Sequence, residues 1–400
     1  MSLDVRAPAL DLATGPVPAP PPAARPPSAR GRALVVLAPA ALTVVLGLWG
    51  IRRQNTMWGD EAVTHQLAER DPSRIWDTVQ QVDLVHALYY AVMHVIFDLF
   101  GAGLLSLRLP SVLAMAAAAG GVGLLGLRLA GPRAGTPAGL VFALLPQVQK
   151  YAQEGRSYAM VCALIAWATC ALVANVERGG RWRWAAYGLT LLVACLLHEF
   201  AVLALVAHGV TLFVSRPPKG VLRAWSVTAA GVATGLLPLA VVSAGQSEQV
   251  SWIGGPVRPY HLLVAVVVGV ACARAPLRSG GPVSLAALAV PMLVLPGALL
   301  LTASLVKPLF VDRYVLFSNI GVALLLGAWL DHVRRLPRRS PVVYVAVAAL
   351  VPPSLELRTP PEPEQRRHRR RHRRPRGGPP RRRAAPPLRQ TADPDRRAPR

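Results

Sequence analysis

Two adjacent carboxylates, Asp60 and Glu61, follow shortly after the first apolar segment of the chain. Carboxylates beside a membrane surface are costly unless water solvates them or the protein uses them. The residues from Asp60 to Glu69 fit a short amphipathic helix, so Asp60 could simply cap its start. Alternatively, a carboxylate beside an acceptor hydroxyl can remove its proton while that hydroxyl attacks a sugar carbon. These residues alone leave both interpretations open.

A second polar group begins at Asp83 and continues with His86, Tyr89 and Tyr90. Helical spacing places His86 and the two tyrosines on one face. Tyrosines are common at membrane interfaces, so the pair is typical of anchoring residues. His86, three residues from Asp83, is more informative and marks this helix as a candidate part of a site.

A third group occupies a turn between two apolar segments and is unusually rich in side chains that are charged or form hydrogen bonds. Arg156 is a natural phosphate ligand, because its planar guanidinium matches phosphate oxygens. An ion pair between Glu154 and Arg156 that merely solvates the turn is the alternative. The group consists of Lys150, Tyr151, Gln153, Glu154, Arg156, Ser157 and Tyr158.

Two further groups lie at the ends of apolar segments. His198 and Glu199 do not extend to the zinc-protease pattern HExxH, because Val202 stands where the second histidine is required, and a hydrogen-bonded turn explains them. The last group could anchor a helix or bind a lipid phosphate at headgroup depth. It consists of Lys307, Asp312, Arg313 and Tyr314.

The elements that position these groups are membrane helices. Hydrophobic residues make up 53% of the 400-residue chain and charged residues only 16%. A soluble fold could not cover so much apolar surface. Apolar runs near the length of a span predict an all-α, polytopic bundle of about eleven spans. The predicted spans are residues 33–50, 108–129, 135–150, 157–176, 184–197, 200–215, 224–243, 261–273, 282–303, 315–331 and 341–354.

The apolar helix at residues 84–100 is ambiguous, because it carries His86, His94 and Asp98. If it lies in the interface and the N-terminus is inside, the Arg clusters between spans all face the cytoplasm, as the positive-inside rule requires. If it spans, the rule fails. The interfacial assignment predicts a long first external loop at residues 51–107, and it places all five polar groups on the external face.

The net charge of +24 does not indicate nucleic-acid binding. About +11 of it comes from residues 361–400, where fifteen arginines face four acids (15 − 4), with no interleaved aromatic residues. Residues 355–400 are predicted to be a disordered Arg/Pro-rich tail, derived from a frameshift or acting as a basic arm for anionic lipid or polymer. Residues 1–32 are predicted to be a disordered cytoplasmic tail. The four cysteines, without CxxC spacing, are interpreted as core residues.

The order of these motifs resembles a known group of enzymes. An Asp-Glu pair follows the first span, then come a His-x-Leu-Tyr-Tyr helix, a Tyr-x-Gln-Glu-x-Arg-x-Tyr turn and a late Pro-x-x-x-x-Arg-Tyr element. This resembles the GT-C glycosyltransferases of the protein O-mannosyltransferase (family 39) type. The resemblance covers residues 33–330 within a predicted domain of residues 33–354. Its most specific parts are Asp60-Glu61 and residues 153–158.

The resemblance implies an inverting transfer of a sugar, often mannose, from a polyprenyl-phosphate donor at the extracytoplasmic face of the cell membrane. The acceptor would be a protein, a lipid or a glycan. Asp60 would be the catalytic base with Glu61 beside it, Arg156 and Arg313 would hold the phosphate, and His86 would line the pocket. The remaining substrate-binding candidates are Tyr89, Gln153, Glu154, Tyr158, His198, Lys307 and Tyr314.

The sequence carries no P-loop and no GxGxxG motif, and it shows no evident metal cluster. A phosphate leaving group needs positive charge more than protonation. We therefore expect a reaction without metal or cofactor, with membrane lipids as surroundings and no nucleic-acid partner. Two alternatives remain open: a transporter or flippase for a lipid or polyanion, and a truncated, inactive member of the family.

Overall fold

The computed structural model describes residues 28–52, 56–245 and 282–334. The chain divides into residues 1–358 and 359–400, and the second unit lies outside the described residues. Several predictions also lie outside them. These are the spans at 261–273 and 341–354, the tail at 355–400, most of the tail at 1–32, and the environment of Cys272.

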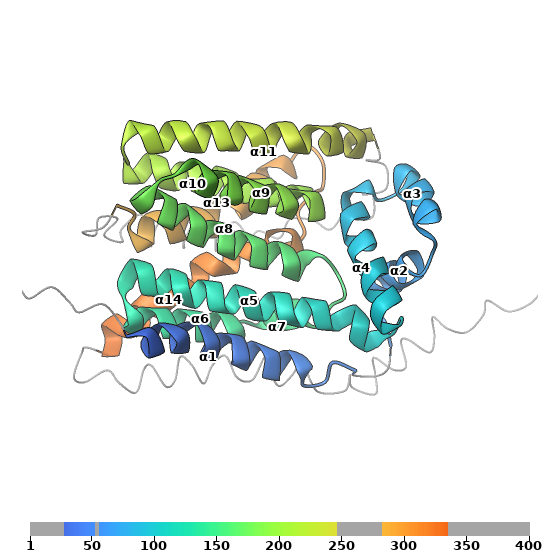
Figure 1. Ribbon diagram of the computed structural model, residues 1–400, viewed down its shortest axis with the longest axis horizontal. Helices are drawn as coiled ribbons and strands as arrows, with labels where there is room; N and C mark the ends of the chain where they lie inside the picture. The colour runs from blue at the N-terminus through green and yellow to red at the C-terminus, as the bar shows by residue number, and fades with distance from the viewer. Residues whose placement is uncertain (1–27, 53–55, 246–281, 335–400) are drawn as a thin grey trace, which may run out of the picture. The chain divides into compact units, whose positions relative to one another are not determined.

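Every regular element of the described part is a helix, which confirms the all-α prediction (Figure 1). The elements are α1 (Ala29–Leu48), α2 (Gly59–Ala68), α3 (Pro72–Gln81), η2 (Leu84–His86), α4 (Ala87–Phe100), α5 (Leu104–Ala130), α6 (Pro132–Leu144), α7 (Pro146–Ala152), α8 (Tyr158–Arg178), α9 (Arg181–Leu197), η3 (Glu199–Ala201), α10 (Val202–Ser215), α11 (Lys219–Gly245), α13 (Leu285–Ala303), η5 (Asp312–Ser318) and α14 (Asn319–Arg334).

Six helical segments among the described residues are long and apolar enough to cross a membrane: Ala29–Leu48, Leu104–Ala130, Tyr158–Arg178, Lys219–Ser243, Leu285–Ala303 and Asp312–Arg334. Shorter apolar helices, including α6, α9 and α10, pack among them. The predicted span at 135–150 is instead two helices, α6 and α7. Pro146 has no N–H to continue α6 and occupies the first position of α7.

The segment between α1 and α5 lies at one end of the bundle. Figure 1 shows α4 running across that end, whereas α5, α8 and α11 run along the bundle. The predicted interfacial helix at 84–100 is therefore η2 followed by α4. Asp83 precedes η2 with a φ of 66°, a left-handed conformation that non-glycine residues rarely adopt.

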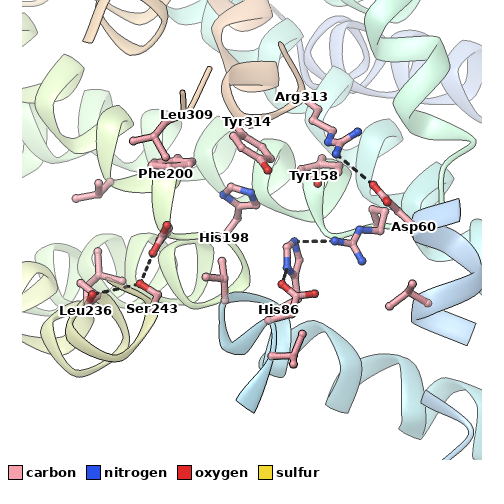
Figure 2. Close-up of a pocket in the computed structure, with 18 of the residues that line it drawn as sticks. Asp60, His86, Tyr158, His198, Phe200, Leu236, Ser243, Leu309, Arg313 and Tyr314 are labelled. Carbon is pink, nitrogen blue, oxygen red and sulfur yellow. Dashed lines mark hydrogen bonds and ion pairs between the residues drawn. The ribbon is translucent and has the colours of Figure 1, made fainter. Parts of the chain in front are cut away.

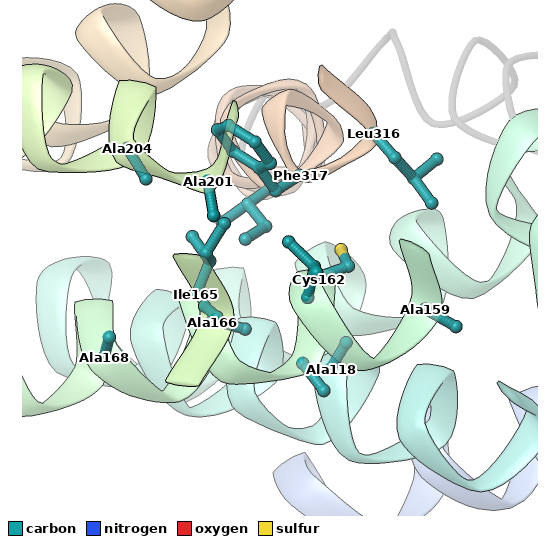
Figure 3. Close-up of a cluster of buried hydrophobic side chains, with 14 of the residues drawn as sticks. Ala118, Ala159, Cys162, Ile165, Ala166, Ala168, Ala201, Ala204, Leu316 and Phe317 are labelled. Carbon is teal, nitrogen blue, oxygen red and sulfur yellow. The ribbon is translucent and has the colours of Figure 1, made fainter. Parts of the chain in front are cut away.

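Small residues let the central helices approach closely, as is common between membrane helices. A Cβ on Gly135 of α6 would lie 2.6 Å from the backbone nitrogen of Leu127 in α5, so only glycine fits there. Figure 3 shows small side chains further on, where Ala118 of α5 and Ala159, Cys162 and Ala166 of α8 belong to one buried cluster with Phe317. The predicted role of cysteines as core residues is confirmed for the three described ones, which are buried and free: Cys162, Cys170 and Cys195.

Candidate functional site

A cavity of about 660 Å³ opens at the end of the bundle where α2 and α4 lie (Figure 2). It gathers side chains from all five polar groups found in the sequence, although 254 residues separate its first and last predicted members (314 − 60). The predicted site residues that line it are Asp60, His86, Arg156, Tyr158, His198, Lys307, Arg313 and Tyr314.

Asp60 faces this cavity from the first turn of α2. Its Oδ2 lies 3.2 Å from Nη2 of Arg313, which comes from η5 (Figure 2). The pair is not sealed off, since 31% of the Asp60 side chain remains exposed against 14% of Arg313. The guanidinium of Arg313 also lies over the rings of Tyr158 and Tyr314, with its carbon 5.7 and 5.9 Å from the ring centroids. An accessible carboxylate thus stands beside a cation that aromatic faces hold in place.

Glu61, the next residue, points away from the cavity and is 1% exposed. Arg108 of α5 forms a two-pronged ion pair with it, with N–O distances of 2.8 and 2.6 Å. The backbone N–H groups of Trp58 and Gly155 donate to the same carboxylate. Burial alone would raise the pKa of Glu61, but the hydrogen bonds from Arg108 and the two backbone groups outweigh it and lower the pKa. Glu61 therefore ties α2, α5 and the turn before α8 together.

Asp83 organises a second buried network. Its Oδ1 lies 2.6 Å from Nδ1 of His86, and its Oδ2 accepts a hydrogen bond of 2.5 Å from Tyr90. His86 Nε2 lies 3.1 Å from Nη2 of Arg156, which can only donate, so Nδ1 carries the proton. Nη1 of Arg156 donates to Thr64 and Tyr90. The network fixes the direction of the Arg156 guanidinium at the cavity wall.

The charges of this network follow from its geometry. Burial would raise the pKa of Asp83, but His86, Tyr90 and Arg156 reverse this and lower it to about 2. Burial and the nearby Arg156 lower the pKa of His86. Burial, His86 and Arg156 hold the pKa of His198 well below its ordinary value. Both imidazoles are therefore neutral at pH 7, and the positive charge at the wall is that of Arg156, Arg313 and Lys307.

Aromatic side chains form another part of the wall. The ring of His198 lies 4.6 Å from that of Tyr314 and 5.5 Å from that of Tyr158, measured between centroids. Phe200 lies 5.3 Å from Tyr314 and lines the same cavity. Beyond them the cavity is largely apolar and ends near Glu199, whose Oε2 accepts a hydrogen bond from Ser243. The cavity thus has a charged part at Asp60 and an apolar extension toward α11.

Three of the predicted binding residues do not line the cavity. Tyr89 is fully buried beside Tyr90. Gln153 uses its Nε2 to donate to the carbonyls of Leu46, Gly47 and Trp49, which end α1. Their predicted role in binding substrate remains a prediction, but the contacts of Gln153 position α1.

Glu154 is the third residue outside the cavity wall. Burial raises its pKa to about 7, and the attraction of Arg313 and Lys150 offsets this only in part. Its Oε1 is buried and has no hydrogen-bond partner among the described residues. Glu154 is therefore a carboxyl group that can change its protonation near neutral pH beside the Asp60–Arg313 pair.

The sequence analysis missed Arg108 and Thr64 as members of these networks. It named Asp83 and Tyr90 in the second polar group but did not include them among the site residues. Arg108 carries a usable signal: a cation at the end of an apolar span needs an anionic partner. Among the described residues no cluster of three or more metal-ligating side chains occurs. The expectation of a metal-independent reaction remains a prediction.

Comparison with known proteins shows which solved structures have a similar fold. A scan against protein-family models and a search of curated proteins find no match. Among solved structures, the chain is similar to ArnT from Cupriavidus metallidurans in the apo state, with a TM-score of 0.53 and 16% identity over 78% of this chain and 61% of ArnT. ArnT bound to undecaprenyl phosphate has a TM-score of 0.55 and 16% identity, over 81% of this chain and 64% of ArnT. The chain shares the ArnT fold and covers less than two thirds of its length.

Proposed function

We propose that this membrane protein transfers a sugar from a polyprenyl-phosphate donor to an acceptor hydroxyl. The observation that carries the proposal is the pairing of the accessible Asp60 carboxylate with Arg313 in a cavity that Arg156 also lines. A base and two cations are what phosphate-leaving chemistry requires. The shared fold supports the same conclusion, because ArnT is a transferase of the GT-C type and its structure has been solved with bound undecaprenyl phosphate.

In the proposed reaction, Asp60 accepts the proton of the acceptor hydroxyl while the oxygen attacks the anomeric carbon of the donor sugar. The bond between that carbon and the phosphate oxygen breaks on the opposite side, so the configuration inverts. The electron pair leaves with the phosphate. Arg313 and Arg156 stabilise the negative charge that develops there, in a site lined by aromatic side chains.

The ion pair of Asp60 with Arg313 suggests an order of events. A carboxylate held by a guanidinium is a poor base, and a guanidinium held by a carboxylate is a poor phosphate ligand. The phosphodiester of the donor carries one negative charge, as Asp60 does, and competes with it for Arg313, whose planar guanidinium matches phosphate oxygens. Donor binding would therefore release Asp60 for the acceptor, so proton removal begins only when the donor is present.

The other networks would position these groups. Glu61 and Arg108 hold the start of α2 in place, and hence Asp60, while Asp83, through His86, orients Arg156. Mannose is the sugar that the sequence resemblance favours, and the acceptor would be a protein, lipid or glycan at the extracytoplasmic face. The apolar extension near Leu236 and Leu309 suits an isoprenoid or lipid segment.

A transfer assay tests the proposal. Membranes containing the full chain would receive radiolabelled polyprenyl-phosphate mannose, with Asp60→Asn as the test variant and Asp77→Asn, an exposed carboxylate of α3 away from the cavity, as the control. Label should move to an acceptor fraction with wild type and Asp77→Asn only. Equal transfer by Asp60→Asn would remove Asp60 as the base. Transfer from another lipid-linked sugar would revise the mannose assignment alone.

A further inference from the structure

A second groove, of about 440 Å³, lies between α1, α6 and α14. Arg133, at the start of α6, and Arg334, at the end of α14, stand at one end of it. The rest of the wall is apolar apart from Thr136, with Leu42, Leu140 and Leu330 among its side chains. None of these residues lines the cavity around Asp60, so the groove is a separate feature.

The charged end of this groove lies at the opposite end of the bundle from the site. Arg108 of α5 contacts the site through Glu61, and α5 ends at Ala130, 22 residues later (130 − 108), just before α6 begins. A helix rises ~1.5 Å per residue, so these ends are about 33 Å apart. The hydrocarbon core of a bilayer is ~30 Å thick. With the site at one interface, Arg133 therefore lies at the other.

The groove has the dimensions of a single lipid chain. The 13 residues of α6 extend about 20 Å, and the groove follows them from Arg133 to Leu144. One leaflet contributes ~15 Å of hydrocarbon, half of the core. An acyl chain that starts at headgroup depth beside Arg133 would run along α6 past Leu140 toward the middle of the bilayer.

The two arginines give the end of the groove a positive charge, with Asp331 one turn before Arg334 in α14. Both are exposed, and neither forms an ion pair or hydrogen bond among the described residues. Guanidinium groups match phosphate oxygens in geometry and charge, and anionic lipids concentrate basic segments at a membrane surface.

We propose that this groove is a binding site for an anionic phospholipid of the leaflet opposite the site. The phosphate group would accept hydrogen bonds from Arg133 and Arg334, and one acyl chain would fill the groove along α6. Bound there, the lipid would join α1, α6 and α14, and so stabilise the bundle without entering the transfer reaction.

The test uses the full chain, purified and delipidated in detergent, with thermal unfolding and native mass spectrometry as readouts. Phosphatidylglycerol should raise the unfolding temperature and remain bound, whereas phosphatidylcholine with the same chains should do so much less. Glycerol phosphate, which lacks the chains, should have no effect. These arms separate a lipid headgroup from free phosphate, and none of them depends on transferase activity.

Two variants sharpen the test. Arg133→Gln with Arg334→Gln should weaken phosphatidylglycerol binding at least about tenfold, since each charge-assisted hydrogen bond contributes substantially. Arg178→Gln with Arg181→Gln removes the same charge from the exposed connection between α8 and α9, outside the groove, and should leave binding unchanged. Leu140→Trp should fill the groove and block the lipid.

Three results would overturn the proposal. One is equal stabilisation by both lipids, because it would show that charge plays no part. Another is unchanged phosphatidylglycerol binding by Arg133→Gln/Arg334→Gln. The third is no effect of any lipid on the wild type, which would indicate that the groove is filled by another part of the chain.

Discussion

Asp60 and Glu61 are neighbours in the first turn of α2, yet their surroundings differ completely. Glu61 is buried, and it accepts hydrogen bonds from Arg108 and two backbone N–H groups. Asp60 keeps 31% of its side chain exposed in a cavity, and Arg313 is the one cation with which it forms an ion pair among the described residues. One carboxylate has all its bonding capacity occupied within the protein, and the other retains some for a substrate.

This difference explains why two adjacent acids can have two roles. A buried carboxylate that is fully hydrogen-bonded has nothing left with which to accept a proton, but it can fix the elements that contact it. A carboxylate in an open cavity can accept a proton if its partner moves. In our interpretation Glu61 therefore supports the position in which Asp60 acts, and variants of the two should fail in different ways.

The largest effect is expected at Asp60. Asp60→Asn removes the proton acceptor but keeps the shape of the side chain, so transfer should fall by ~10²- to 10⁴-fold, the usual contribution of a general base. The unfolding temperature should stay near that of wild type, because the carboxylate is partly solvated. Radiolabel transfer and thermal unfolding of the same preparation measure both. A large loss of stability would mean that Asp60 is a structural residue instead.

Glu61→Gln should show the opposite pattern, with stability lost first. It leaves Arg108 as a buried cation without a charged partner, which costs about 3–5 kcal/mol. Expression and unfolding temperature should both drop. The double variant Glu61→Gln/Arg108→Gln should recover part of the stability, and a thermal-unfolding cycle over the four proteins measures the coupling. If the stability losses of the two single variants simply add in the double variant, the ion pair does not hold the helices together.

Arg313 is expected to matter for the donor. Arg313→Gln removes a charge-assisted contact worth ~1.5–3 kcal/mol, so the KM for the lipid-phosphate sugar should rise roughly 10- to 100-fold. Lys307→Gln, a cation further along the same wall, is the matched control and should have the smaller effect. An unchanged donor KM in Arg313→Gln would argue against its phosphate role.

Asp83 should act indirectly, and its effect should be smaller. Asp83→Asn can keep the left-handed backbone, since asparagine tolerates positive φ, but it loses the charge that holds His86 and Tyr90. We expect donor affinity to weaken by less than the change at Arg313 causes. Asp83→Ala should be worse, because alanine also adds backbone strain. A donor affinity equal to that of the wild type in Asp83→Asn would show that the carboxylate does not position Arg156.

The smallest effect concerns pH and Glu154. Its pKa is raised to about 7 in the folded protein, against an ordinary value of 4.5. The folded state therefore holds more protons between these two values, and stability is lost as the pH rises through them. Glu154→Gln stays neutral, so the unfolding temperature of wild type should fall relative to this variant between about pH 5 and pH 8. If the difference in unfolding temperature between wild type and Glu154→Gln does not change with pH, the raised pKa of Glu154 is contradicted.

The sequence was sufficient to predict the helical membrane fold. Hydropathy alone located the described spans to within a few residues, because roughly 20 apolar residues in a row have few other stable arrangements. It also predicted that the five polar groups share one face, because the positions of basic clusters fix the direction of each helix. The break between α6 and α7 was missed, although Pro146 carried the signal.

Which polar side chain does what was decided by the tertiary structure. Adjacent residues such as Asp60 and Glu61 project about 100° apart on a helix, but the sequence does not say which direction meets the cavity. Glu61 is buried because Arg108, 47 residues away, meets it there. Gln153 likewise binds the end of α1, over 100 residues earlier. Hydropathy and charge determine where each helix lies, but only contacts between distant residues determine which polar atoms remain free for a substrate.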